Sequence, residues 1–166
     1  MEPQDKSSKD RDFLTYGRSR AVRLEDFDYA ADEVIHLVVC SMGGITLTEP
    51  ALAEAICENV AHYSKKLQYE LYGYCLMPDH IHILLSPAQS GIPIAKWLQQ
   101  FKSYTTNLHR KAGGSAKLWQ RSAYDHVCRE HETAEAVLAY IVENPVRRRF
   151  VDDWKRWPWT RVLIDL

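Results

Sequence analysis

The sequence lacks the features that identify several common classes of protein. Its 4 cysteines are widely spaced and form no Cys-x-x-Cys pair, which argues against a zinc ribbon and for reduced, mostly buried thiols. No apolar run approaches membrane-spanning length, and the polar residues 1–11 contain no signal-peptide core. Internal repeats and low-complexity segments are also absent. We therefore expect a cytoplasmic protein without a membrane partner.

The rest of the composition is that of one ordinary globular domain. With 166 residues, 46% hydrophobic and 26% charged, the chain is long enough to bury a sizeable core. Its net charge of −1 conceals an asymmetry, because residues 1–94 carry 8 basic and 14 acidic side chains whereas residues 95–166 carry 13 and 8. Near the end of the chain, basic and aromatic residues are interleaved: Arg147, Arg148, Arg149, Phe150, Trp154, Lys155, Arg156, Trp157, Trp159 and Arg161. Such a mixture can bind phosphates and stack on bases, so a DNA- or RNA-binding surface is one hypothesis; a solvated face beside core tryptophans is the alternative.

Hydrophobic periodicity predicts alternating strands and helices after an N-terminal arm or irregular lead-in at residues 1–30. The expected strands cover residues 34–40, 68–76, 80–86 and 122–129, and the expected helices cover residues 49–66, 94–111 and 133–144. This order, β-α-β-β-α-β and a final helix, is typical of the ferredoxin-like split βαβ arrangement, an α+β fold. We expect an antiparallel sheet with helices on one face, an added C-terminal helix, and a single domain over residues 31–166.

A pair of histidines stands out in the third predicted strand. His80 and His82 flank Ile81, and residues two apart in a strand point to the same face. Two imidazoles on one face can converge on a divalent metal ion, whereas Ile81 and Ile83 would fill the opposite face. The spacing alone is weak evidence, because 7 histidines in this chain give roughly 0.3 such pairs by chance. An ordinary strand with two half-buried histidines is the alternative.

The last predicted helix offers a second group of chemically active residues. Tyr140 and Asn144 are four positions apart, so they lie on one face of a helix. The tyrosine could act as a nucleophile on a phosphate and the carboxamide as a third metal ligand. Alternatively, Tyr140 lies at the edge of the core and Asn144 caps the helix. Tyr104 in the preceding helix is a second candidate nucleophile. It ranks below Tyr140 because the residue one turn later is Leu108, which cannot bind a metal ion.

Several linked motifs resemble those of a known family. The run Leu76-Met77-Pro78-Asp79-His80-Ile81-His82-Ile83-Leu84-Leu85 is similar to the signature of single-tyrosine HUH transposases, in which two histidines flank a hydrophobic residue. The resemblance is closest to the branch of the IS200-like superfamily associated with repetitive extragenic palindromes (REP). It continues in order through Leu118-Trp119-Gln120-Arg121, Tyr124-Asp125-His126-Val127-Cys128-Arg129, Tyr140-Ile141-x-x-Asn144-Pro145-Val146-Arg147 and Pro158-Trp159.

The resemblance implies a function and roles for individual residues. His80, His82 and Asn144 would bind a divalent metal ion, Mg²⁺ or Mn²⁺, and Tyr140 would be the nucleophile. The expected activity is nicking and rejoining of single-stranded DNA beside a palindromic hairpin through a 5′-phosphotyrosine intermediate, as in DNA transposition. The protein would bind single-stranded or hairpin DNA as a monomer or homodimer. A hairpin-binding protein without cleavage activity is the main alternative.

Other residues are candidates for DNA contacts. Trp119, Arg121 and Arg147 belong to the matched motifs, and three further basic residues lie outside them: Lys102, Arg148 and Arg149. After Asn-Pro-Val-Arg the family commonly has a small residue and a glycine, where this chain has Arg148 and Arg149. We expect this departure to add phosphate contacts. An RNA-recognition domain and a hydrolase of small phosphate esters are further alternatives, but the aromatic-rich strand motif of the former is absent.

Overall fold

The computed structural model describes residues 33–87, 90–115, 117–128 and 132–165, so the predicted arm at residues 1–30 lies outside the described residues. The main elements follow the predicted order. They are β1 (Ile35–Cys40), α1 (Pro50–Lys66), β2 (Glu70–Leu76), β3 (His80–Ser86), α2 (Ile94–Lys111), β4 (Tyr124–Val127), α3 (Ala134–Val142), α4 (Asn144–Arg147), the short 3₁₀ helix η2 (Trp154–Arg156) and β5 (Thr160–Val162).

The sheet has the strand order β4-β1-β3-β2-β5, and all neighbouring strands are antiparallel. Strands β1 to β4 and helices α1 and α2 form the predicted ferredoxin-like arrangement, which confirms the fold class. Strand β5 was not predicted. It pairs with β2, which would otherwise be an edge strand with unpaired backbone groups.

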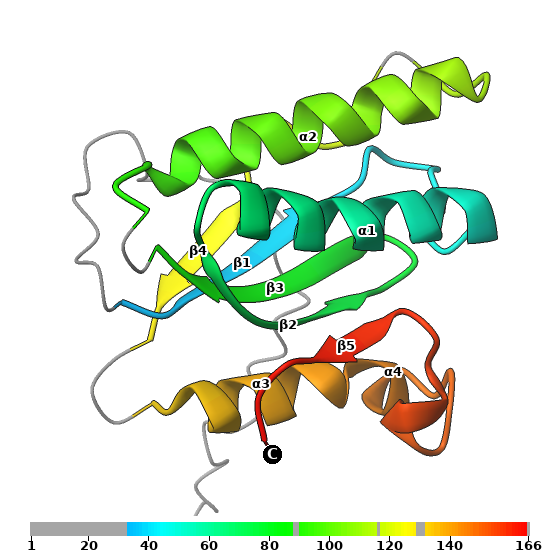
Figure 1. The fold of residues 1–166 in the computed structure, drawn as a ribbon. Helices are drawn as coiled ribbons and strands as arrows, with labels where there is room; N and C mark the ends of the chain where they lie inside the picture. The colour runs from blue at the N-terminus through cyan, green and yellow to red at the C-terminus, as the bar shows by residue number, and fades with distance from the viewer. Residues whose placement is uncertain (1–32, 88–89, 116, 129–131, 166) are drawn as a thin grey trace, which may run out of the picture.

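Helices α1 and α2 cover one face of the sheet and build the larger core (Figure 1). Their apolar stripes follow the helical period, and Trp97 and Phe101 of α2 stack one turn apart with ring centroids separated by 5.3 Å. The sheet contributes alternate residues such as Leu37, Ile81 and Ile83, all fully buried. Within the described ranges, no helix combines the length and the apolar character needed to cross a membrane.

Helices α3 and α4 lie on the opposite face of the sheet (Figure 1). Leu138 and Ile141 of α3 pack there with Cys75 and Leu84 in a smaller apolar cluster. Gly73 of β2 permits this close approach, because a Cβ atom at this position would lie 2.5 Å from the carbonyl oxygen of Arg161 and 2.8 Å from Leu138 Cδ1. The helix that carries the candidate nucleophile is therefore packed tightly against the sheet.

The C-terminal helix differs from the prediction at its end. We expected one helix from Thr133, as N-cap, to Asn144, where Pro145 would stop it. Thr133 does cap α3, since its side chain accepts a hydrogen bond from the Ala136 amide, but α3 ends at Val142. Asn144 instead begins the short helix α4, and Pro145 lies in its first turn. A proline is tolerated there because amides of the first turn have no acceptor within the helix.

The turn between β2 and β3 is held by distant segments of the chain. The amides of Ser41 and Leu47, in the loop after β1, donate to the carbonyls of Asp79 (2.9 Å) and Pro78 (2.7 Å). The indole of Trp157 donates to the last carbonyl of β2 at 2.8 Å. This turn leads directly into the histidine pair, so its position is fixed from both sides.

Candidate active site

Strand alternation places the two histidines of β3 on the face that α3 covers. The strand partners of His80 and His82 on β1 are Cys40 and Val38, and His36 lies on the same face two residues before Val38. All three histidines are buried, with exposed fractions of 2% for His36 and His82 and 6% for His80. The sequence prediction that His80 and His82 share a face separate from Ile81 is confirmed.

The three imidazoles form a continuous chain of contacts. His80 Nε2 lies 3.0 Å from His82 Nε2, and His82 Nδ1 lies 3.0 Å from His36 Nε2. At the other end, His80 Nδ1 lies 2.6 Å from the carboxylate oxygen Oδ1 of Asp79, which is itself largely exposed. The rings of His36 and His82 stack with centroids 5.2 Å apart. Each ring is thus held on at least one of its two nitrogens.

Burial determines the charge of the inner rings. Desolvation lowers the pKa of His36 to about 3, aided by the nearby His126 and His80, and it lowers the pKa of His82 well below its ordinary value. Both rings are therefore neutral near pH 7. The hydrogen bond from His80 holds the pKa of the Asp79 carboxyl below its ordinary value, and the charge of Arg148 contributes to this shift.

The arrangement of donor atoms fits a divalent metal ion. The Nε2 atoms of His80 and His82 face each other at 3.0 Å, which matches two nitrogen ligands about 2.1 Å from one ion and at right angles to each other. The Nδ1 atoms are both occupied by outer partners, as is usual for metal-binding histidines. Among the described residues, no three His, Cys, Asp or Glu side chains are grouped as a metal site. Among these described residues, the carboxamide of Asn144 is the third protein ligand that the sequence led us to expect.

Asn144 is buried at the start of α4, with 8% of its surface exposed. Its Nδ2 atom donates to the carbonyl of Ile141 at 2.8 Å. This bond uses the donor side of the carboxamide, so the oxygen Oδ1 is the atom that a metal ion would bind. Metal binding by Asn144 stays a prediction.

The predicted nucleophile, Tyr140, lies half-buried on α3. Arg147 contacts this tyrosine in two ways. Its guanidinium carbon is 4.0 Å from the centroid of the tyrosine ring, and its Nη2 donates to the Tyr140 carbonyl at 2.7 Å. Arg147 and Arg148 are also near enough to His82 to contribute to the lowering of its pKa, after burial and the other two histidines. Arg147 thus contacts the tyrosine and lies within electrostatic range of His82.

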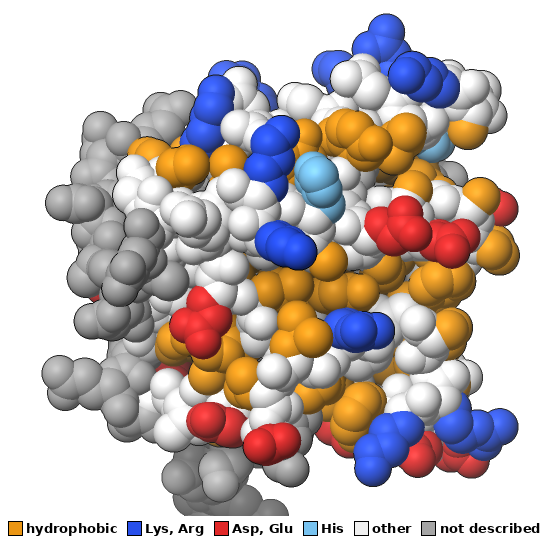
Figure 2. All heavy atoms as spheres, in the orientation of Figure 1, with side chains coloured by type: hydrophobic (Ala, Val, Ile, Leu, Met, Phe, Trp, Pro, Cys, Tyr) orange, Lys and Arg blue, Asp and Glu red, His pale blue; other side chains and the backbone are white. Residues whose placement is uncertain are grey.

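The basic segment predicted from the sequence is exposed. Arg147, Arg148 and Arg149 all lie at the surface, and Arg149 has a φ of 60°, a left-handed conformation that favours glycine. In Figure 2 basic and acidic side chains gather at the lower right, over the α4–η2 region. Phe150 is 50% exposed and stacks on Trp157 with a centroid distance of 5.4 Å.

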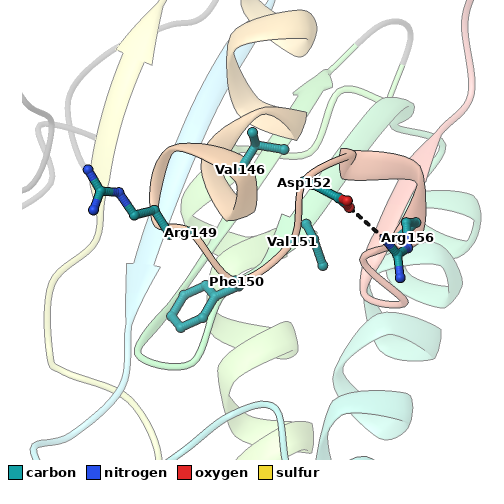
Figure 3. Close-up of a pocket in the computed structure, with 6 residues that line it drawn as sticks. All are labelled: Val146, Arg149, Phe150, Val151, Asp152 and Arg156. Carbon is teal, nitrogen blue, oxygen red and sulfur yellow. Dashed lines mark hydrogen bonds and ion pairs between the residues drawn. The ribbon is translucent and has the colours of Figure 1, made fainter.

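A shallow pocket of about 540 Å³ opens in this segment (Figure 3). The residues that line it come from α4 and the loop into η2: Val146, Arg149, Phe150, Val151, Asp152 and Arg156. An ion pair of 2.7 Å between Arg156 and Asp152 closes one side. The lining therefore combines apolar, basic and acidic side chains.

The other three DNA-contact candidates lie in different environments. Arg121 is exposed in the loop before β4. Trp119 is buried against Phe101 and its indole donates to Thr105 at 2.8 Å. The ammonium of Lys102 donates to three carbonyls of residues 120–122, and burial lowers its pKa to about 8. These contacts account for Trp119 and Lys102 without DNA, and DNA binding by either residue stays a prediction.

Two residues of the site were not among the predicted ones. His36 and Asp79 hold the outer nitrogens of His82 and His80. Asp79 was quoted only as part of a motif, although its place next to His80 was a signal. His36 could have been noticed as the one polar residue within the apolar run 34–39.

Comparison with protein families assigns the class of this fold and site. The model of the family described as "Transposase IS200 like" matches residues 31–144. This range includes strands β1 to β4, the histidine pair and helix α3, and it ends before β5. The chain belongs to this family. Within it, the chain is similar to the REP-associated tyrosine transposases, as the relatives below indicate.

Two proteins of Haemophilus influenzae are related in sequence. One, assigned as a REP-associated tyrosine transposase, is 28% identical over 102 residues, or 55% of this chain and 58% of that protein. This chain therefore matches less than two thirds of the length of that relative. The other is an uncharacterized protein that is 21% identical over 158 residues, covering 76% of this chain and 88% of that protein.

Two solved structures share the fold. A structure of a REP-associated tyrosine transposase bound to a REP hairpin superposes with a TM-score of 0.67 at 17% identity, covering 81% of this chain and 79% of that one. A protein of Deinococcus radiodurans R1 assigned as a transposase gives a TM-score of 0.50 at 19% identity, covering 72% and 93%. The ferredoxin-like core of this chain is thus the family's scaffold.

Proposed function

We propose that this chain is a metal-dependent endonuclease and strand transferase that cuts single-stranded DNA beside a palindromic hairpin. The observation that carries this proposal is the pair of Nε2 atoms 3.0 Å apart on the sheet face that α3 covers. Family membership and the likeness to a structure that contains a REP hairpin support DNA as the substrate. In this proposal β3 carries the metal ligands and α3 carries the nucleophile.

His80, His82 and Asn144 are the residues that would hold the ion. When bound, a divalent ion would supply positive charge for the non-bridging oxygens of the scissile phosphate. Imidazole and carboxamide ligands suit Mn²⁺ at least as well as Mg²⁺, which prefers oxygen ligands. Asp79 and His36 keep the two ligand rings in place.

Tyr140 would attack the scissile phosphorus through its hydroxyl oxygen. A bond forms between that oxygen and phosphorus while the bond to the 3′ oxygen breaks; the phenol releases its proton to solvent, and the leaving oxygen takes one up. The products are a 5′-phosphotyrosine and a free 3′-hydroxyl, so rejoining needs no ATP. A free phenol titrates near pH 10, so the attack requires stabilisation of developing negative charge. The guanidinium of Arg147, 4.0 Å from the ring centroid, is placed to provide it.

The α4–η2 segment would bind the DNA next to the cut. Arg147, Arg148 and Arg149 can neutralise backbone phosphates, and the exposed ring of Phe150 can stack on an unpaired base. Keeping an arginine at a φ of 60° costs on the order of 1 kcal/mol, and a functional contact of Arg149 would explain why the chain tolerates it.

The test is a nicking assay on a hairpin with single-stranded flanks, taken from palindromic repeats near the coding region and labelled at its 3′ end. With Mn²⁺ present, we expect a covalent protein–DNA adduct on a denaturing gel. Tyr140→Phe should abolish the adduct and leave hairpin binding intact, because only the attacking oxygen is removed. Tyr104→Phe is the matched control, since Tyr104 is exposed on α2.

The outcomes separate the two candidate functions. Hairpin binding by the wild type without any adduct would favour the binding protein that has lost cleavage. An undiminished adduct in Tyr140→Phe would disprove the assignment of the nucleophile. Turnover without an adduct would indicate that water is the nucleophile.

A further inference from the structure

Neither hydrogen-bond partner of the histidine pair takes part in the proposed reaction, yet the two partners determine where the protons of the pair lie. An ionised carboxylate only accepts hydrogen bonds, so the 2.6 Å contact with Asp79 requires a proton on His80 Nδ1. A neutral His80 then presents a lone pair at Nε2, toward His82. A metal ligand must be neutral, so this is the form of His80 that can bind an ion.

Without a metal ion, and with neutral rings and an ionised Asp79, one arrangement of protons satisfies the three contacts that join Asp79, His80, His82 and His36. His82 donates from Nε2 to His80 Nε2, and His36 donates from Nε2 to His82 Nδ1, each over 3.0 Å. Every ring is neutral and carries one proton. Any other arrangement of neutral rings leaves two lone pairs facing each other at hydrogen-bond distance.

Metal binding reverses the direction of the hydrogen bond between His36 Nε2 and His82 Nδ1. Both Nε2 atoms of the pair must then present lone pairs to the ion, so His82 carries its proton on Nδ1. His82 Nδ1 can keep its 3.0 Å contact with His36 only by donating, which requires a lone pair on His36 Nε2. His36 must consequently carry its own proton on Nδ1.

We infer that His36 is a positioning residue of the metal site, whose ring changes tautomer together with His82 when the site is filled. The inference rests on the proposed function, because it assumes metal binding by His80 and His82. The protons balance: the Nε2 proton of His36 passes to His82 Nδ1, the Nε2 proton of His82 is released to solvent, and His36 takes up one proton from solvent at Nδ1. Each ring remains neutral throughout.

The location of His36 suits this role. It is 2% exposed and its ring stacks on His82, so water does not compete for the shared hydrogen bond. It lies on β1, whose six-residue register with β3 fixes the distance between the two strands. A histidine is one of the few side chains that can donate or accept at the same atom.

The first experiment is nitrogen NMR of the histidine rings in the wild type, with and without Zn²⁺ as a diamagnetic probe. We expect His36 and His82 both to change from the Nε2–H to the Nδ1–H tautomer on addition of Zn²⁺, while His80 stays Nδ1–H. Unchanged tautomers of His36 in a protein that binds Zn²⁺ would overturn the inference. This measurement needs no variant and therefore does not depend on the stability of one.

The second experiment measures Mn²⁺ affinity by calorimetry in the absence of DNA. His36→Phe keeps a ring of similar size but removes the acceptor, and we expect binding to weaken about 10- to 100-fold. His36→Gln can place an oxygen near the same point and should restore most of the affinity. The control is His62→Phe, an exposed histidine of α1 on the other side of the sheet.

The results distinguish this inference from the proposed function. If the wild type binds no metal ion, both fail. If it binds Mn²⁺ and forms the adduct, but His36→Phe binds Mn²⁺ as tightly as the wild type, only the inference about His36 fails. Equal weakening in His36→Phe and His36→Gln would also overturn it, because the acceptor would then not matter.

Discussion

Both faces of the sheet bury apolar side chains, but the face that α3 covers also buries a row of histidines. On the side of α1 and α2, Ile81 and Ile83 are fully buried in the larger apolar core. On the side of α3, His80 and His82 are buried just as deeply but in contact with polar groups. One strand of alternating residues therefore places core residues on one face and the candidate metal ligands on the other.

The difference between the faces lies in what burial costs. An apolar side chain gains roughly 1.5–3 kcal/mol when it leaves water, whereas a polar group loses free energy unless it finds a partner. The histidine chain meets this requirement through contacts of 2.6 to 3.0 Å along its length. The functional face is thus tolerated because its polar atoms are paired, and the apolar face makes the fold stable enough to hold it.

The largest expected effect comes from removing a ligand. His80→Ala should reduce adduct formation by more than about 100-fold. Replacing a hydrogen-bond partner of a metal ligand usually costs about 10- to 100-fold, and loss of the ligand itself should cost more. The protein should remain folded, because α1, α2 and their core are untouched. Single-turnover nicking measures the loss, and Ile81→Val is the control from the other face. Nicking reduced equally in both variants would contradict the division between the faces.

On the other face, Ile83→Ala should affect stability instead of chemistry. Removing a fully buried branched side chain typically lowers the free energy of unfolding by about 2–5 kcal/mol. Urea unfolding measures this change. Mn²⁺ affinity, determined under conditions where the variant is folded, should stay within a few-fold of the wild type. A strong loss of metal affinity would show that the two faces are coupled.

Gly73→Ala tests how closely the functional helix must approach the sheet. The added methyl group would meet the Arg161 carbonyl oxygen at 2.5 Å and Leu138 at 2.8 Å. Overpacking of this kind costs about 1–3 kcal/mol, and here it would displace β5 or α3. We expect both lower stability and slower nicking, because α3 carries Tyr140. A variant as stable and active as the wild type would indicate that the contact relaxes easily.

The smallest effect is a dependence of stability on pH from the histidine face. The folded-state pKa of His36 is lowered to about 3, and that of His82 lies well below its ordinary value, while the unfolded rings titrate near 6.5. Below pH 6.5 the unfolded chain therefore binds protons that the folded chain does not. Stability is greatest above this pH and is lost as pH falls toward about 3.

From pH 7 to pH 5.5 we expect the free energy of unfolding to fall by about 2 kcal/mol through these two rings. Urea unfolding of the metal-free protein at several pH values measures the slope. His36→Gln should remove about half of it. A slope that is the same in His36→Gln would show that other groups cause the pH dependence.

Local patterns predicted much of the fold and the common face of His80 and His82. The alternation at residues 80–86 correctly placed His80 and His82 together, and the helical period predicted α2 with the bounds that the structure shows. Both are properties of neighbouring residues. Strand β5 has only 3 residues, too few for a period to be recognised.

The remaining features depend on contacts between distant parts of the chain. His36 is 46 residues from His82, and their contact follows from the β1–β3 register, which no local pattern specifies. Composition likewise suggested DNA contacts for Lys102 and Trp119 but could not show that one bonds to carbonyls and the other lies in the core. Residue type indicates what a side chain can do; packing decides what it faces.

The anchored turn before β3 has a consequence for motion during the proposed reaction. Hydrogen bonds from the loop after β1 and from Trp157 tie this turn to segments at both ends of the described chain. Local opening here would break several of these contacts at once, so the histidine pair should be among the slowest parts of the molecule to fluctuate. Strand exchange needs different DNA ends to reach one site in turn. In the proposed reaction the DNA would then have to be brought to the histidines, which stay in place.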